Sequence, residues 1–379
     1  MISINKKSDC CGCGACMQKC PKNCISMKKD TEGFLYPEVD KKICVECGLC
    51  ERVCPVIHKE KLEKEVPVAY AVYAKNSAMR ENSSSGGMFT LLAEQILQRG
   101  GLVFGSAFDE NWQVSHIKAS DTTELALLRG SKYLQSDTKN TFVEARQALQ
   151  EGREVLFSGT GCQIEGLQRY LGKVYENLIT VDILCHGVPS PNVWEEYLRF
   201  QEKKFKSEVE YVTFRSKRQG WRDFSLEIKF KNGTQYSEIF GKDLYMQLFL
   251  RNICLRPSCY DCRFKDLSRT SDLTIGDFWG IENIAPKIDD NRGTSLVLVH
   301  SQKGRDMMHA LQKAVMIQEV DAEAALPLSA ESRHSVPVHR NRERFFRELH
   351  QKEIDRIGEL LKDPLKTRVK RKIKNFIKK

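Results

Sequence analysis

Two groups of cysteines near the N-terminus have the spacing of iron–sulfur ligands. The first group is Cys10, Cys13, Cys16 and Cys20, and the second is Cys44, Cys47, Cys50 and Cys54. Both groups follow C-x2-C-x2-C-x3-C, and a proline comes directly after each run. This repeated pattern is typical of chains that hold two [4Fe–4S] clusters, in which the fourth cysteine of each run binds the other cluster. We therefore expect Cys54 to complete the first cluster and Cys20 to complete the second.

Residues 1–60 are accordingly predicted to form a small bacterial-type ferredoxin domain that its clusters stabilise, because so short a segment buries little core. Zinc is the alternative metal, although zinc sites rarely need cysteines at this density twice over. Cys11 and Cys24 are left over, and the simplest interpretation of Cys24 is a small buried hydrophobic residue. The charged residues 61–67, which end in a proline, are predicted to be a linker.

A third set of cysteines lies some two hundred residues later, in the segment "CLRPSCYDC". Cys254, Cys259 and Cys262 follow C-x4-C-x2-C, a spacing seen in plant-type ferredoxins. We expect them to hold a third [4Fe–4S] cluster whose fourth ligand is Cys185 or Cys162. Cys185 is favoured, because the turn "CHG" at the end of a predicted strand presents a side chain outward. A zinc knuckle that clamps the loop is the alternative.

The elements that must position these residues alternate between strands and helices. Predicted strands are residues 69–74, 101–108, 154–159 and 178–184, and predicted helices are residues 86–100, 141–152 and 162–172. This alternation indicates α/β construction with some parallel pairing. Residues 209–216, 224–231 and 234–240 are consecutive strands, and "KNGT" forms a hairpin turn between the last two. The predicted fold class is therefore a mixture of α+β and α/β, with a mixed-sheet domain over residues 68–336.

Loops at the ends of predicted strands carry the remaining polar residues of interest. They are "NSSSGG" at 82–87, "SGTGCQ" at 158–163, "ILCHG" at 183–187 and "TIGDFWG" at 274–280. Serine hydroxyls and glycine amides at a helix N-terminus can hold a phosphate, although an ordinary helix cap has the same composition. Because α/β folds bind cofactors at strand ends, the loops together predict one crevice for a nucleotide-like cofactor.

The composition limits the setting in which this chemistry takes place. The chain of 379 residues has 15 cysteines, starts without an apolar leader and has no apolar run long enough to span a bilayer. We therefore expect a reducing cytoplasm, where cysteines serve metal or redox chemistry. The net charge of +10 gathers in the last sixteen residues, which carry eight Lys or Arg and no acid.

Residues 337–379 are predicted to be a helical basic tail, with an amphipathic cationic helix after Pro364. Such a helix can lie reversibly at an anionic membrane, so peripheral membrane contact is one interpretation and a solvated helix is the other. Phe376 is the one aromatic residue of the last sixteen, so nucleic-acid binding is not expected.

Several segments resemble, in the same order, those of the beta subunits of coenzyme F420 hydrogenases and dehydrogenases. These segments are "SSSGGMF", "LRGSKYLQSD", "FSGTGCQIEGL", "DILCHGVPSP", "CLRPSCYDCRF" and "SDLTIGDFWG". The resemblance reaches to about residue 335, and the N-terminal domain matches the longer members. It implies FAD, a [4Fe–4S] cluster and hydride exchange with a deazaflavin or another substrate. One departure is the glycine of "GTGCQ", where the family is expected to have proline.

The resemblance also assigns roles to residues of this chain. Ser84, Ser85, Gly86 and Gly87 would cradle the flavin or its pyrophosphate, and further cofactor contacts would come from Gly130, Gly159, Thr160 and Asp277. Lys132 would place a positive charge where the reduced flavin becomes anionic. Cys185, Cys254, Cys259 and Cys262 would hold the cluster beside the flavin. Apart from the resemblance, the proton of a two-electron step would come from His186 or Tyr133, unless their roles are structural.

The sequence thus predicts an FAD-dependent iron–sulfur oxidoreductase. Clusters carry single electrons and organic substrates take two, and a flavin converts between them. The expected route runs from a ferredoxin-type donor through the clusters and FAD to a small-molecule substrate. One alternative is an electron-transfer subunit that relays electrons to a partner enzyme, and another is a zinc-stabilised scaffold.

Overall fold

Two glycines make the tight turns that place the N-terminal cysteines. In the computed structural model, Gly14 and Gly48 have φ values of 75° and 72°, a left-handed conformation that residues with a side chain disfavour. Each begins a short helix, α1 (Ala15–Lys19) or α2 (Leu49–Arg52), that carries the third cysteine of its run. Between them, β1 (Ile25–Lys29) and β2 (Leu35–Val39) form an antiparallel pair. Residues 1–58, 66–327, 330 and 333–361 are described, so most of the predicted linker lies outside them.

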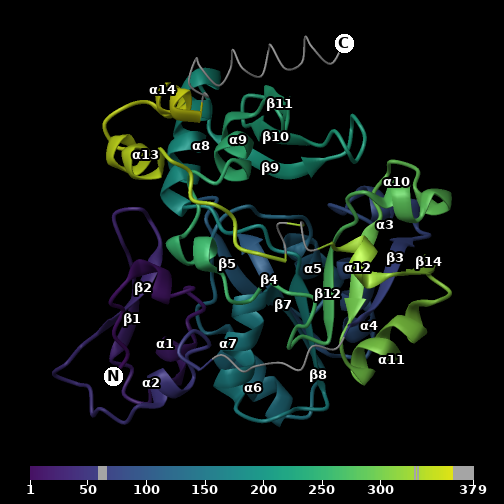
Figure 1. The fold of residues 1–379 in the computed structure, drawn as a ribbon, viewed down its shortest axis with the longest axis horizontal. Coiled ribbons are helices and arrows are strands. Elements are labelled where there is room, and N and C mark those ends of the chain that lie inside the picture. The colour runs from purple at the N-terminus through teal and green to yellow at the C-terminus, as the bar shows by residue number, and fades with distance from the viewer. Residues whose placement is uncertain (59–65, 328–329, 331–332, 362–379) are drawn as a thin grey trace.

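A nine-stranded mixed sheet forms the centre of the rest of the chain (Figure 1). Its order is β14 (Val315–Val320), β3 (Val68–Ala74), β13 (Ser295–Val299), β12 (Leu273–Asp277), β8 (Leu178–Ile183), β7 (Val155–Thr160), β4 (Leu102–Phe108), β5 (Val114–Ala119) and β6 (Ser136–Asp137). Parallel pairing joins β12 to β8, β8 to β7, β7 to β4 and β5 to β6, and the other pairs are antiparallel. The predicted mixed α/β construction is confirmed.

Helices cover both faces of this sheet, as the alternation of buried strand residues requires. On β7, Leu156 faces one side with α4 (Met88–Gln98), α5 (Thr122–Leu128) and α11 (Gln302–Leu311). Its neighbours Val155 and Phe157 face the other side, where α6 (Thr141–Gln150) and α7 (Gly161–Leu171) pack. Both sides of the strand are apolar because both are covered. The predicted strands and helices of this region are therefore confirmed to within a few residues.

A smaller antiparallel sheet lies beside the large one, with the strand order β11 (Gln235–Ile239), β10 (Ser225–Phe230) and β9 (Val209–Ser216). The predicted turn between β10 and β11 is confirmed, since Gly233 has φ 81° and the Phe230 amide donates to the Thr234 carbonyl over 3.0 Å. This sheet shares a core with α8 (Pro191–Phe205), α9 (Leu244–Leu250), α13 (Arg342–Glu348) and α14 (Ile354–Gly358). Residues 337–361 are therefore packed onto the main fold, and Phe345 is fully buried.

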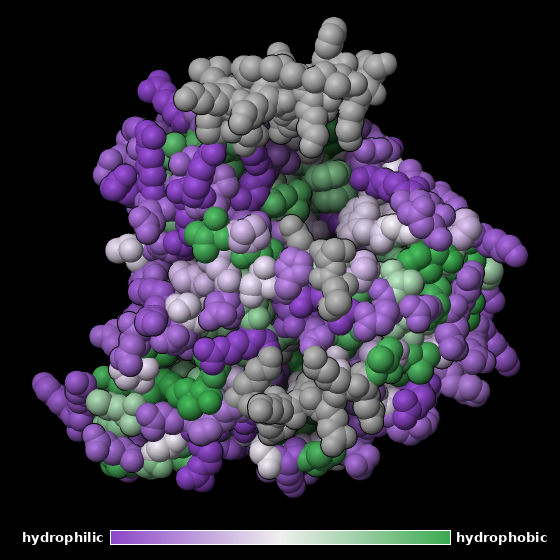
Figure 2. Space-filling model, in the orientation of Figure 1, coloured by the Kyte–Doolittle hydropathy of each residue, from purple (hydrophilic) through white to green (hydrophobic). Residues whose placement is uncertain are grey.

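Short helices complete the described chain: α3 (Ser77–Glu81), α10 (Ile281–Ile284), α12 (Ala322–Ala325), η1 (Lys7–Asp9), η2 (Pro257–Asp261), η3 (Pro286–Ile288) and η4 (Glu359–Leu361). Figure 2 shows one face that is mostly hydrophilic, with smaller hydrophobic areas at the lower left and near the β14 edge. Within the described ranges, no helix is both long and apolar enough to cross a bilayer. The predicted cationic helix falls within residues 362–379, outside the described part.

The N-terminal domain is docked firmly on the rest of the protein (Figure 1, lower left). Cys13, Ala15 and Val53 belong to the same buried core as α6 and α7. A partly buried ion pair adds to this contact, because Arg342 donates to both carboxylate oxygens of Glu32. The two parts are therefore held in one fixed arrangement.

Candidate functional site

A cavity of about 720 Å³ opens at one edge of the large sheet. This volume lies within the range of about 300–1,000 Å³ that is usual for cofactor and small-molecule sites. Strands β3, β12, β8 and β7 run in the same direction, so their carboxyl ends meet at this edge. Three of the four loops predicted to form one crevice, 158–163, 183–187 and 274–280, contribute to the lining, and the fourth, 82–87, does not.

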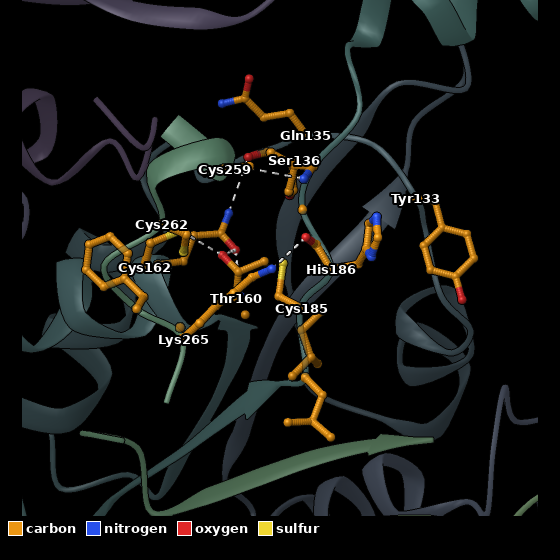
Figure 3. A pocket seen from close by; sticks show the side chains of 18 of the residues that line it. Tyr133, Gln135, Ser136, Thr160, Cys162, Cys185, His186, Cys259, Cys262 and Lys265 are labelled. Carbon is orange, nitrogen blue, oxygen red and sulfur yellow. Dashed lines mark hydrogen bonds between the residues drawn. The ribbon is translucent and has the colours of Figure 1, made fainter. Parts of the chain in front are cut away.

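Four cysteines from three segments of the chain line the cavity together, and we name them group III (Figure 3). Cys162 is the second residue of α7, Cys185 follows β8, and Cys259 and Cys262 lie in and just after η2. Their charges act on one another: Cys185 is influenced by the other three, and Cys259 and Cys262 are influenced by Cys162. The fold thus brings together thiols that are up to a hundred residues apart in the sequence.

Group III is chemically suited to the positively charged core of an iron–sulfur cluster. Burial and then mutual repulsion raise the pKa of Cys185, and burial raises the pKa of Cys259 to about 12. Such thiols ionise when iron compensates the charge, since metal binding displaces their protons. The Val188 amide points at the Cys259 Sγ at 3.4 Å and so provides a hydrogen bond of the kind that tunes cluster sulfurs.

The thiols of group III suit a cluster by their number and chemistry. Four cysteines line one cavity, and a [4Fe–4S] cubane needs four thiolates, each bound to a different iron. A zinc ion also takes four cysteines, so iron and sulfide analysis separates the two metals. The residues of group III therefore fit a [4Fe–4S] cluster.

The structure corrects the expected ligand set at one position. Cys254 does not line the cavity but is fully buried in the core of the smaller sheet, where its charge acts on Tyr245. Its carbonyl accepts a hydrogen bond of 2.9 Å from the Ser190 amide, which fixes the backbone here. Cys162, the alternative fourth ligand, takes the place in group III that was expected for Cys254.

The N-terminal cysteines gather in the two expected sets. Group I is Cys10, Cys13, Cys16 and Cys54, in which the charges of Cys10 and Cys54 both act on Cys16. Group II is Cys20, Cys44, Cys47 and Cys50, which line one small cavity together with Cys24. The Cys24 Sγ lies 3.4 Å from the Cys20 Sγ, and the residue is buried, in agreement with a packing role. The structure thus places Cys54 beside the cysteines of the first run and Cys20 beside those of the second run, as the sequence predicted.

Group I lies directly against the helix that carries Cys162. A Cβ atom added at Gly166 of α7 would lie 2.9 Å from the Cys13 Sγ, so only glycine allows this approach. Cys11 lies between the two groups, because its thiol influences, and is influenced by, the pKa values of both Cys13 and Cys162. Its place in the cavity lining had no signal in the sequence beyond its adjacency to Cys10.

Opposite the thiols, the cavity has a wall of aromatic and basic residues, including Tyr133, Phe249 and Lys132. The Lys132 amine donates to the carbonyl oxygens of Leu127 and Arg129 over 3.0 and 2.8 Å. Burial lowers the pKa of Lys132 to about 7, because the charged amine is poorly solvated there. Lys132 therefore lies where a flavin contact was predicted, and that role stays a prediction.

Asp277 also reaches the cavity, but its oxygens are engaged by protein groups. Its Oδ1 accepts from the Arg215 Nη2 and from the Trp221 indole, both over 2.9 Å, and its Oδ2 lies 2.7 Å from the Arg215 Nη1. Trp279 stacks on Trp221 with a ring separation of 4.7 Å and remains 49% exposed. Asp277 thus positions a buried arginine and an aromatic pair at the cavity edge.

The serine–glycine loop 84–87 lies outside the cavity lining. The Ser84 hydroxyl accepts from the Ser131 amide over 2.8 Å, and the Gly86 amide donates to the Ser295 hydroxyl over 3.0 Å. Gly87 has φ 95° and begins α4. These contacts give the loop a structural task, and its predicted part in holding a flavin is not tested by them.

The other predicted cofactor contacts differ in position. Ser85 donates to the Thr294 carbonyl, and Gly130, with φ 81°, has open space around it and is not part of the lining. Gly159 and Thr160 do line the cavity, and Thr160 caps α7 just before Cys162.

Two histidines line the cavity as well, of which one was predicted. His186 hydrogen-bonds through its Nε2 to the Asn252 Oδ1 over 2.7 Å. His116 had no signal in the sequence, because it occupies an ordinary buried strand position. Its Nε2 lies 3.0 Å from the Ser158 carbonyl and its Nδ1 lies 2.7 Å from the Ser136 hydroxyl. Burial lowers the pKa of His116 to about 4, so the neutral ring donates to the carbonyl and accepts from the serine.

Comparison with known proteins decides the family. Residues 69–141 and 152–325 match the N-terminal and C-terminal parts of the coenzyme F420 hydrogenase/dehydrogenase beta subunit. The chain belongs to this family. In this F420 hydrogenase/dehydrogenase beta-subunit homologue, residues 9–57 also match a 4Fe–4S dicluster domain, so its N-terminal domain is an iron–sulfur module of the ferredoxin type.

Two relatives of the main part of the chain share about a quarter of their aligned residues with it. The chain is 25% identical over 187 residues to one of the subunits of the F420H2 dehydrogenase of Methanosarcina mazei, which covers 46% of this chain and 53% of that one. It is 24% identical over 357 residues to the coenzyme F420-dependent sulfite reductase of Methanocaldococcus jannaschii, covering 88% of this chain and 51% of that one. The chain thus spans about half the length of these relatives. The N-terminal part is 43% identical over 63 residues to a ferredoxin of Saccharopolyspora erythraea, covering 16% of this chain and 52% of that one.

A solved structure of the F420-reducing [NiFe] hydrogenase complex from Methanosarcina barkeri is also similar. The match has a TM-score of 0.45 at 15% identity and covers 79% of this chain and 94% of that one.

Proposed function

We propose that this homologue is an iron–sulfur flavoprotein oxidoreductase. Groups I and II hold the two clusters of the ferredoxin-type domain, and group III holds a third [4Fe–4S] cluster beside an FAD in the large cavity. Electrons from a ferredoxin-type donor pass along this row and reach a small organic acceptor or a deazaflavin. The observation that carries the proposal is that one cavity of about 720 Å³ is lined both by the thiols of group III and by aromatic and basic residues.

The order of the clusters follows from the contacts between the groups. Group II includes Cys47, which is exposed, so a protein donor can approach it closely. Group I is packed through Cys13 against Gly166 of α7, the same helix that carries Cys162 of group III. The route from group II to group I and then to group III therefore leads from the surface to the cavity.

The charge of the cavity suits an anionic cofactor. The basic residues of its lining are Lys132, Arg215, Arg263, Lys265 and Arg269, and the acidic residues are Asp261 and Asp277. Arg215 is paired with Asp277, and Arg269 is paired with the buried Asp182 behind the lining. The remaining excess of positive charge favours the pyrophosphate of a dinucleotide, and the exposed Trp279 offers a flat apolar surface for one of its rings. When bound, a flavin exchanges single electrons with clusters and a hydride with an organic substrate.

Absorbance and cofactor analysis of the anaerobically purified protein test the proposal. We expect a brown protein that releases FAD when it is denatured. Replacement of Lys132 by Met should lower the FAD content, whereas replacement of the exposed Lys118 of β5, which does not line the cavity, should not change it. Wild-type protein that contains iron and sulfide but releases no flavin would contradict the flavin part of the proposal.

A second candidate is an electron-transfer subunit that hands electrons to a partner enzyme. The length relationship favours it, because the chain spans about half of its relatives, one of which is named as a dehydrogenase subunit. The isolated chain separates the two candidates. An enzyme reduces a specific organic acceptor when a reductant is supplied, whereas a relay subunit reduces only artificial dyes.

The location and the tail complete the proposal. We place the protein in the cytoplasm, with peripheral membrane contact through the basic residues 364–379, which lie outside the described part of the chain. Flotation with anionic vesicles, with and without these residues, tests the contact. Equal partitioning of the two proteins would reject it.

A further inference from the structure

A buried arginine lies between the N-terminal domain and the cavity. Arg256 is fully buried, and its guanidinium donates to the carbonyl oxygens of Cys10 and Leu35 over 2.8 and 2.9 Å. It also donates to the Gln135 Oε1 over 3.1 Å and stacks 4.2 Å from the centre of the Tyr36 ring. All these partners are neutral.

The charge of Arg256 has no carboxylate to compensate it among the described residues, since none forms an ion pair with this guanidinium. A buried charge without a counter-charge is strongly unfavourable, so folded proteins place an opposite charge near it. A [4Fe–4S] cubane with four thiolate ligands carries net negative charge in its usual redox states. The clusters are therefore the natural counter-ions of this arginine.

Both neighbouring cysteine groups lie within reach of this charge. In group I, Arg256 is an electrostatic neighbour of Cys10, whose carbonyl it also binds. In group III, the Cys259 amide donates to the Arg256 carbonyl over 2.9 Å, and the guanidinium charge also acts on Cys162 and Cys259. The backbone approaches closely here, because a Cβ atom at Gly12 would lie 2.9 Å from the Arg256 Nη1. Its hydrogen-bond and ring partners include no residue of group II.

We propose that Arg256 is a positioning residue for electron transfer that raises the reduction potentials of the clusters in groups I and III relative to the cluster in group II. Net charge near a cluster is one of the main determinants of its potential, and a fixed positive charge stabilises the reduced, more negative state. Electrons that enter at group II would then move inward to the cavity. The part of this inference that concerns group III rests on the proposed function, whereas the part on group I does not.

Redox titration of the intact, cluster-loaded protein, followed by EPR, tests the inference. Replacement of Arg256 by Gln should lower the reduction potential of the cluster in group I relative to that in group II by about 59 mV. For one electron, this is about a tenfold change in the equilibrium between the two clusters. Group II serves as the internal reference, and Cys47→Ser identifies its signal. Arg256→Lys keeps the charge and should retain most of the wild-type difference.

Two further variants keep the test decisive. Gln135→Glu keeps Arg256 and places a side chain of the same shape beside it, and the new carboxylate compensates the charge of the guanidinium. This variant should therefore lower the same potentials even if Arg256→Gln does not fold. Arg342→Gln breaks another contact between the domains, the partly buried ion pair with Glu32, and should leave the potentials unchanged.

The inference is overturned if Gln135→Glu shifts no potential, if it shifts all clusters equally, or if Arg342→Gln reproduces its effect. The iron content distinguishes this failure from a failure of the proposed function. A chain that lacks the third cluster would contain less iron but would still report the potential of group I.

Discussion

Replacement of Gly166 by Ala perturbs the contact on which the electron route depends. In an exposed helix this change would stabilise the protein by about 1 kcal/mol, because alanine has the higher helix propensity. Here the new Cβ would lie 2.9 Å from the Cys13 Sγ and 3.0 Å from its Cβ, whereas ordinary contacts lie at 3.4–4 Å. The N-terminal domain must therefore move by about 0.5 Å, and the sulfur cannot rotate away when it binds iron.

Overpacking of this kind costs about 1–3 kcal/mol. After the gain in helix propensity, we expect the free energy of unfolding of the cluster-loaded protein to fall by up to about 2 kcal/mol. The midpoint of denaturant-induced bleaching of the cluster absorbance measures this loss. Stopped-flow reduction should also show slower electron arrival at the cavity, because group I has moved away from α7.

Gly241→Ala is the matched control, since no heavy atom lies within 4 Å of its added Cβ. It should change neither the midpoint nor the rate. If Gly166→Ala instead raises the midpoint and leaves the rate unchanged, then Cys13 does not lie against α7 and the proposed order of the clusters is refuted.

Two predictions concern the stability of the fold. His116 is buried with its pKa lowered to about 4, against about 6.5 when unfolded, so its contribution is complete above pH 6.5 and is lost as the pH falls towards 4. Between pH 6.5 and 4, the loss in the free energy of unfolding should therefore be smaller in His116→Gln than in the wild type, by up to about 3 kcal/mol. An equal loss in both proteins would show that the ring is not buried in its neutral form. Asp243 caps α9 and accepts from the hydroxyls of Tyr197 and Tyr236, so Asp243→Ala should destabilise the protein by about 3 kcal/mol in equilibrium unfolding. Tyr236→Phe should cost about 1 kcal/mol, and a loss as large as that of Asp243→Ala would contradict this partition.

The N-terminal site could be predicted from the sequence because its ligands are local. The spacing of each run and the glycine before its third cysteine determine the turn, so Cys13 and Cys16 are brought together within a few residues. The strands around β7 were also predictable from local sequence, because each is a short apolar run of the kind that a sheet covered on both faces requires.

The third set of ligands could not be read from spacing alone. Cys254 completes the C-x4-C-x2-C pattern, yet the pairing of its backbone with Ser190 directs it into a core. Cys162 joins Cys259 only through the folding of distant segments. The same holds for His116 and for the antiparallel strands β13 and β14, whose positions depend on packing between remote parts of the chain.

The central claim is that group III holds a third cluster, and iron and sulfide analysis of the anaerobically purified protein tests it most directly. We expect about twelve irons per chain, with about eight in Cys162→Ser and about twelve in Cys254→Ala, because only the first change removes a cluster ligand. A wild-type content of about eight irons, or a loss in Cys254→Ala but not in Cys162→Ser, would contradict the account.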